Sequence, residues 1–151
     1  IHHCSTETTS TMLLVILAIA AIVAKVTATN VEKRAHNFHT GIVSQGCMEC
    51  ICQTKSGCKP IGCHFEHNSH LCGYFQINES YWIDCGRLGG DWHTCANDLE
   101  CSSHCVQNYI QKNIGNSSCR HTCNSYNVLH SVGPAGCSDP IYYMYPLYGC
   151  Y

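Results

Sequence analysis

Four residues whose side chains could bind a metal ion lie close together in the stretch HFEHNSH. They are His64, Glu66, His67 and His70. Imidazole nitrogens suit zinc and copper, and a carboxylate could complete such a ligand set. The stretch reads as a β-hairpin, however, and alternate residues of a strand point to opposite faces of the sheet. We therefore interpret these side chains as a solvated surface, and we expect no metal ion or other cofactor.

The cysteines offer a second kind of chemistry, because 15 of the 151 residues are cysteine. Three pairs have the spacing of zinc ligands, namely Cys47 with Cys50, Cys101 with Cys105, and Cys119 with Cys123. In an oxidising compartment such thiols form disulfides instead. Small secreted domains depend on these crosslinks because their apolar cores are small. We therefore predict a disulfide-rich domain.

An apolar run at residues 12–24, MLLVILAIAAIVA, indicates a secretory signal peptide. The run is short for a membrane span, and Val26 and Ala28 suit the positions before a cleavage site. No basic residue precedes the run, and a buried helix or a signal anchor is the alternative. We expect a leader at 1–28 with its start at Met12, a flexible segment at 29–40, and one domain at 41–151. Removing the leader removes Cys4, and the remaining 15 − 1 = 14 cysteines are enough for seven disulfides.

Charge and compartment restrict the partners. The formal net charge is −2 and only 12% of the residues are charged, which does not indicate a nucleic-acid partner. We predict a secreted, extracellular protein that has no membrane partner once the signal is cleaved.

Hydrophobic spacing predicts the elements that would position these residues. Residues 43–55, 97–111 and 118–130 have helical spacing, and Asn97 or Asp98 could cap the second helix. Residues 61–67 and 71–77 favour two strands around a polar turn. The predicted architecture is α+β, with several helices, a small antiparallel hairpin and many crosslinks. The aromatic tail at 141–151 has no assignment.

Several motifs resemble the invertebrate-type lysozymes, also called the destabilase family. The motifs are CMECICQTKSGC, GCHFEH, LCGYFQI, YWIDCG, CANDLECSSHCVQNY and VGPAGC, and the resemblance covers residues 41–137. It implies a lysozyme-like α+β fold and secretion. The activity it implies is hydrolysis of the β-1,4 linkage between N-acetylmuramic acid and N-acetylglucosamine in peptidoglycan, for antibacterial defence or digestion.

The resemblance also implies four disulfides. They join Cys52 to Cys58, Cys63 to Cys72, Cys85 to Cys105, and Cys95 to Cys101. The pairing of the other six cysteines stays open, because sequence alone cannot choose among the combinations. These six are Cys47, Cys50, Cys119, Cys123, Cys137 and Cys150.

The two positions that carry the family's catalytic carboxyl groups differ here. The family's proton donor is the glutamate of CICxxESGC, and this chain has Lys55 there. The second carboxylate is usually the aspartate of GCxxD, and this chain has Glu66. Glycoside hydrolysis normally needs both groups, and a lysine with a pKa of about 10.4 is a weak acid at neutral pH. We therefore expect muramidase activity to be absent or weak.

Two alternatives remain. The chain could be an active muramidase that uses Glu66 and an unconventional acid, although Glu49, Glu79, Asp98 and Glu100 all lie away from the donor position. It could also be a non-catalytic peptidoglycan-binding protein. The partner in either case is bacterial peptidoglycan or a related chito-oligosaccharide.

Further positions match the family's sugar-binding subsites. They are Tyr74, Gln76, Tyr81, Trp82, Tyr109, His130 and Gly133. Tyr74 and Trp82 are equally compatible with a place in the core. Some family members also cleave isopeptide bonds, and Ser69 and His130 match part of that machinery. Its lysine is missing, which makes this activity a minor alternative. Glycosylation sequons begin at Asn78 and Asn116.

Overall fold

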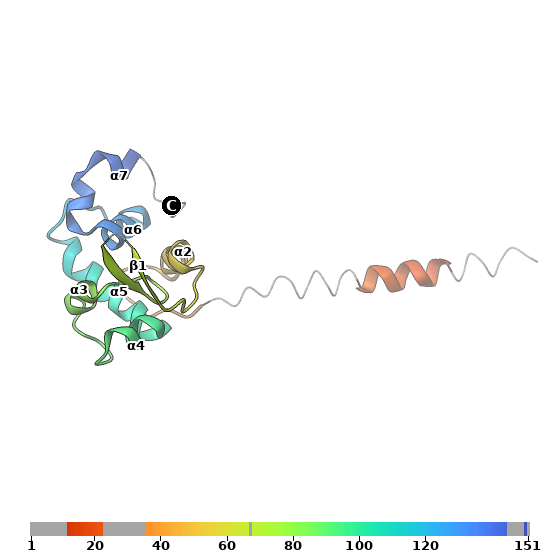
Figure 1. The fold of residues 1–151 in the computed structure, drawn as a ribbon. Helices are drawn as coiled ribbons and strands as arrows, with labels where there is room; N and C mark the ends of the chain where they lie inside the picture. The colour runs from red at the N-terminus through yellow and green to blue at the C-terminus, as the bar shows by residue number, and fades with distance from the viewer. Residues whose placement is uncertain (1–11, 23–35, 67, 145–149, 151) are drawn as a thin grey trace, which may run out of the picture. The chain divides into compact units, whose positions relative to one another are not determined.

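The computed structural model describes residues 12–22, 36–66, 68–144 and 150. It divides the chain into two compact units, Ile1–Ala35 and His36–Tyr151. In the first unit residues 12–22 form a helix (Figure 1). Across the described residues, every helix is too short or too polar to cross a membrane. Cys4, Val26, Ala28 and His67 lie outside the described residues, so the predicted cleavage site stays a prediction.

The second unit is mostly helical and contains one two-stranded antiparallel sheet. Its elements in chain order are α2 (Gln45–Ser56), β1 (Cys63–Glu66), β2 (Ser69–Cys72), α3 (Glu79–Asp84), α4 (Trp92–Asn97), α5 (Leu99–Ile114), α6 (Cys123–Val132), the 3-10 helix η1 (Pro134–Ser138) and α7 (Pro140–Met144). The predicted α+β class is therefore confirmed.

Helix α2 begins and ends on residues whose chemistry favours those positions. The side chain of Ser44 accepts a hydrogen bond from the backbone N–H of Cys47, which satisfies a donor at the helix start. Gly57 follows the last turn in the left-handed conformation, with φ of 64°. One face of the helix, including Met48 and Ile51, is completely buried. This burial fixes the direction in which the last turn presents Lys55.

The hairpin is shorter than the sequence predicts. Cys63 pairs with Cys72 and Glu66 pairs with Ser69, so the second strand starts earlier and ends earlier than expected. After Cys72 the chain turns at Gly73, whose φ is 72°. A Cβ at Gly73 would overlap the carbonyl oxygen of Ala96, so only glycine lets this turn approach α4 closely. Residues 73–77 therefore become a tight turn in the core.

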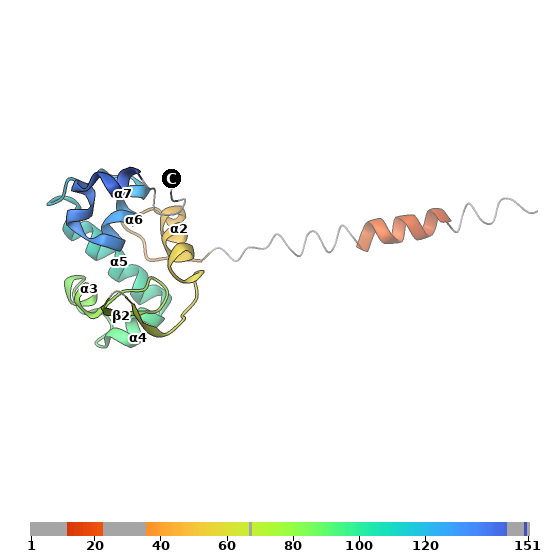
Figure 2. The ribbon, with the colours of Figure 1, turned by 45° about the horizontal axis from the view of Figure 1, so that its top comes forward.

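Helix α5 lies at the centre of the unit and contacts α3, α4 and α6. Figure 2 shows it running between the hairpin with α4 on one side and α6 with α7 on the other. Asp98 caps its start by accepting from the backbone N–H of Cys101 at 2.7 Å, as predicted. Helix α6 begins at Cys123, five residues later than predicted, because Thr122 is its N-cap.

Seven disulfides crosslink this unit. The four predicted pairings, Cys52–Cys58, Cys63–Cys72, Cys85–Cys105 and Cys95–Cys101, are all confirmed. The remaining six cysteines pair as Cys47–Cys123, Cys50–Cys150 and Cys119–Cys137. The three pairs with zinc-ligand spacing are thus all half-cystines. Two of the bridges anchor α2, one to α6 and one to the C-terminal end of the chain.

The compact unit begins at His36, five residues before the predicted boundary at Gly41. The reason is Phe38, whose side chain is 3% exposed and packs edge-on against Phe75. The backbone of Phe38 also exchanges two hydrogen bonds of 2.9 Å with the side chain of Gln45. Residues 36–40 therefore belong to the folded domain and not to a flexible segment.

Candidate functional site

Lys55 occupies the last turn of α2 and is half-buried. Burial lowers the pKa of its ammonium group below the ordinary value, and the nearby carboxylate of Glu66 opposes that shift. A cation at this end of a helix also interacts favourably with the helix dipole. The structure thus places a positive charge at the end of α2, within electrostatic range of Glu66.

Glu66 lies at the end of β1 and is exposed, with 51% of its side chain accessible. Its carboxylate lies 3.1 Å from Nε2 of His64 on the same strand. Glu66 therefore contacts an imidazole of its own strand and acts electrostatically on the Lys55 ammonium. The structure brings the two positions that the sequence analysis predicts to be catalytic within electrostatic range of each other, and they carry one carboxylate and one cation.

His130 also lies within electrostatic range of Lys55 and is buried, with 8% exposure. Its Nε2–H donates to the carbonyl oxygen of Phe75 at 2.9 Å, and its Nδ1 therefore accepts from the hydroxyl of Tyr81 at 3.0 Å. Burial is the main cause that lowers the pKa of His130 to about 3, and the charge of Lys55 lowers it further. The imidazole is neutral in any ordinary buffer.

A cavity of about 220 Å³ opens beside His130. Its lining comes from α3, α5 and the end of α6 and consists of Asn78, Ser80, Tyr81, Asp84, Tyr109, His130, Ser131, Val132 and Gly133. The rings of Tyr81 and Tyr109 stack at 3.7 Å. Burial raises the pKa of Tyr81 well above its ordinary value, so its hydroxyl stays protonated and can donate to His130. Aromatic faces with a few hydroxyl and amide groups suit a saccharide.

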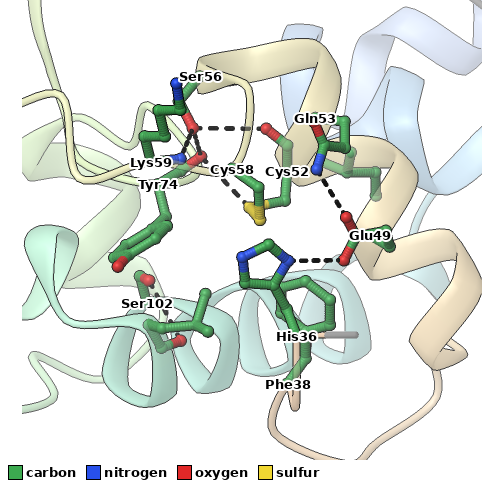
Figure 3. Close-up of a disulfide and its surroundings, with 12 residues drawn as sticks. His36, Phe38, Glu49, Cys52, Gln53, Ser56, Cys58, Lys59, Tyr74 and Ser102 are labelled. Carbon is green, nitrogen blue, oxygen red and sulfur yellow. Dashed lines mark hydrogen bonds and ion pairs between the residues drawn. A yellow bond between two sulfur atoms is a disulfide. The ribbon is translucent and has the colours of Figure 1, made fainter. Parts of the chain in front are cut away.

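Four of the predicted sugar-contacting residues, Tyr81, Tyr109, His130 and Gly133, meet in this cavity, and the other three lie elsewhere. Trp82 is buried and donates from its indole nitrogen to the carbonyl of Leu88 at 2.8 Å, which makes it a core residue. Tyr74 is half-buried, and its carbonyl accepts from the hydroxyl of Ser56 at 2.6 Å (Figure 3).

Gln76 carries two unusual features. Its backbone has φ of 52°, and its buried Oε1 has no hydrogen-bond partner in the described part of the chain. Strained backbone and unpaired buried acceptors concentrate at functional sites. Gln76 does not line the 220 Å³ cavity.

Sequence reasoning missed several lining residues. Asp84 lies within the motif YWIDCG but was given no role, Ser131 lies in none of the motifs, and Ser80 appeared only as part of a sequon. Asp84 pairs with Lys112 of α5 at 3.1 Å, and it brings a carboxylate to the cavity. Asn78 caps α3 through its side-chain oxygen, which accepts from the N–H of Tyr81 at 2.8 Å. Asn116, in the other sequon, is exposed.

The two hairpin histidines that the structure describes, His64 and His70, do not converge on one point. His64 contacts Glu66, whereas His70 packs edge-on against Phe65 across the strand pair. In the described part of the chain, the groups close enough to surround an ion are Cys63, Cys72 and His93, and His36, Glu49 and Cys58. The cysteines of both groups are in disulfides, so neither group supplies a thiolate.

His130 is also poorly placed for isopeptidase chemistry. A serine nucleophile needs a base with an open acceptor nitrogen within hydrogen-bond reach. Both nitrogens of His130 are already engaged, and the imidazole is buried. Ser69 lies on β2, where it pairs with Glu66 across the hairpin.

Comparison with known proteins defines the class to which this fold belongs, which is that of the lysozymes. The crystal structure of Tapes japonica lysozyme matches with a TM-score of 0.69 and 44% sequence identity, and the match covers 75% of this chain and 97% of that one. A sequence identity of 44% supports common family membership as well as a shared fold.

Sequence comparison gives the family. Residues 44–148 match the destabilase family model. The chain is 56% identical over 103 residues to Lysozyme 1 of Crassostrea virginica, which covers 68% of this chain and 56% of that protein. It is 48% identical over 103 residues to a lysozyme of Magallana gigas, which covers 68% and 75%. The chain belongs to the destabilase family of invertebrate-type lysozymes, and its match spans little more than half the length of the Crassostrea virginica protein.

Proposed function

We propose that this protein is a secreted member of the family that binds bacterial peptidoglycan and cleaves it weakly or not at all. The observation that carries the proposal is Lys55, half-buried at the end of α2, where the family resemblance expects the proton donor. A glycosidic oxygen at that position meets an ammonium group. Positive charge also develops on the sugar in the transition state, so the ammonium group opposes the reaction.

The cavity supports the binding half of this proposal. Stacked tyrosine rings offer an apolar face, and Asn78, Ser80 and Ser131 offer donors and acceptors around it. The internal hydrogen bonds of His130 and Tyr81 hold the wall in place without a contribution from Lys55. Loss of the proton donor therefore leaves this wall intact.

Sedimentation with insoluble peptidoglycan tests the binding. We expect the native protein to sediment with it and the variant Ser131→Trp, which fills the cavity from an exposed lining position, to stay in solution. Thr94→Trp is the matched control, because Thr94 is exposed on α4 and does not line the cavity. If all three proteins sediment equally, or if none of them sediments, the cavity is not the peptidoglycan-binding site.

A second candidate is an active muramidase with an unconventional acid, and one observation favours it. Asp84 brings a carboxylate to the cavity that holds the other predicted binding residues. That carboxylate also pairs with Lys112 of α5 at 3.1 Å. Asp84→Asn distinguishes the two candidates, because it abolishes cell-wall lysis by the native protein only if Asp84 is the acid.

A further inference from the structure

The chain enters the domain through the N-terminal arm, which we define as residues 36–43. Three of its backbone N–H groups donate to side chains of helices α2 and α5. Phe38 donates to Gln45 at 2.9 Å, His39 donates to the hydroxyl of Ser103 at 2.8 Å, and Val43 donates to Gln107 at 2.9 Å. The arm is therefore attached by specific bonds along its length.

Two histidine–carboxylate contacts hold the arm from the side. His36 lies 3.0 Å from Glu49 of α2 (Figure 3), and Nδ1 of His39 lies 2.6 Å from Glu100 of α5. The imidazole of His39 also stacks on that of His104, with ring centroids 3.7 Å apart and planes 12° apart. One ring of this stack belongs to the arm and the other to α5.

The stack tolerates one positive charge better than two. Protons on both rings place two cations face to face at this stack, and like charges so close together repel each other. The titratable groups that act on His104 are His39 from the arm and Glu100 from its own helix. Burial, and then the charge of His39, lowers the pKa of His104 below its ordinary value, and Glu100 opposes the shift.

We propose that the N-terminal arm is an acid-sensitive strap, which is released from α5 when His104 is protonated beside His39. Since the docked arm disfavours the proton on His104, the contribution of this stack to docking is fully present above a pH of about 6.5 and is lost as the pH falls below it. Release uncovers Phe38 and the side of Phe75 on which it packs. The carbonyl of Phe75 accepts a hydrogen bond from Nε2–H of His130, so the arm packs against a residue that holds a side chain of the cavity lining.

Hydrogen exchange of the arm amides tests the strap, with rates corrected for the intrinsic effect of pH. In the native protein we expect the protection of the Phe38, His39 and Val43 amides to fall up to about tenfold between pH 7.5 and pH 5.5, the limit set by one proton with an ordinary pKa of about 6.5. His104→Phe keeps a ring in the stack and removes the charge, so its protection stays level.

The matched control is His93→Phe on α4, which keeps a ring beside Trp92 and leaves the arm untouched. It should lose arm protection in acid as the native protein does. Constant protection in the native protein, or an equal loss in His104→Phe, overturns the proposal. If His104→Phe does not fold, NMR titration of the native protein decides. The midpoints of His104 protonation and of arm release must then coincide, and separate midpoints refute the strap. The test does not depend on saccharide binding.

Discussion

Replacing Lys55 by glutamate introduces the group that the family resemblance predicts as the proton donor, and we expect it to produce muramidase activity. Two effects add. An ammonium group about 5 Å from the developing positive charge, at an effective dielectric constant of about 20, raises the barrier by about 3 kcal/mol, or roughly two orders of magnitude in rate. A positioned general acid contributes about 10²- to 10⁴-fold more.

The scaffold is expected to tolerate this change. Lys55 is half-buried and makes no buried hydrogen bond in the described part of the chain, and α2 is covalently attached to α6 and to Cys150. A carboxylate in the last turn loses the favourable helix-dipole interaction, which costs about 0.3–1 kcal/mol. It also lies within electrostatic range of Glu66, and a neighbouring carboxylate raises the pKa of an acid. A raised pKa is what a general acid needs.

Loss of turbidity of a peptidoglycan suspension is the assay, with thermal denaturation as a check on folding. Lys55→Gln separates the two effects, because it removes the charge without supplying an acid. We expect no measurable lysis by the native protein, little by Lys55→Gln and clear lysis by Lys55→Glu. Adding Glu66→Gln to Lys55→Glu should abolish the gain. Rapid lysis by the native protein, or equal rates for Lys55→Gln and Lys55→Glu, would refute the reasoning.

Three further changes test, by thermal or denaturant unfolding, how much residues in and around the site contribute to the stability of the fold. The folded-state pKa of His130, about 3, lies below the unfolded value of about 6.5, so its neutral form stabilises the fold above pH 6.5. This stabilisation is lost as the pH falls toward 3, and the stability difference between the native protein and His130→Phe should shrink over that range; a constant difference contradicts it. Replacing Cys50 and Cys150 by serine opens a bridge of sequence separation 100 and should cost about 4–5 kcal/mol in the chain-entropy account. Gly73→Ala should destabilise by more than about 3 kcal/mol, because its Cβ overlaps a carbonyl of α4, whereas Gly46→Ala meets open space and should change stability by less than about 1 kcal/mol.

The sequence predicts the long elements and the local crosslinks well, because their signals are local. Helical periodicity and an acidic cap locate α5, and a left-handed glycine locates the end of α2. The short helices α3 and α4 were not predicted. Each has six residues, too few to establish a period, and tertiary packing decides whether such a segment is helical. The same limit hid Asp84, which reaches the cavity only because α3 forms.

The sequence predicts which residue types occupy the candidate site. It does not predict which of these residues lie together around the cavity. The identity of Lys55 and Glu66 is visible in the motifs, and so is the lysine at the position where the resemblance expects a proton donor. Which aromatic residues face the cavity depends on packing: Tyr81 lines it, while its neighbour Trp82 points into the core. The burial of Phe38 was equally hidden, since a single phenylalanine in a polar stretch has no periodic partner to reveal it.

The covalent attachment of α2 on two sides has an evolutionary consequence. In a fold held by side-chain packing alone, only that packing would keep α2 in place when the half-buried residue at its end changes its charge. Here the bridges from Cys47 to Cys123 and from Cys50 to Cys150 also hold α2 in place, so position 55 can change with less effect on the fold. A crosslinked lysozyme can lose its reaction while its shape persists, and selection can then act on whatever that shape still recognises.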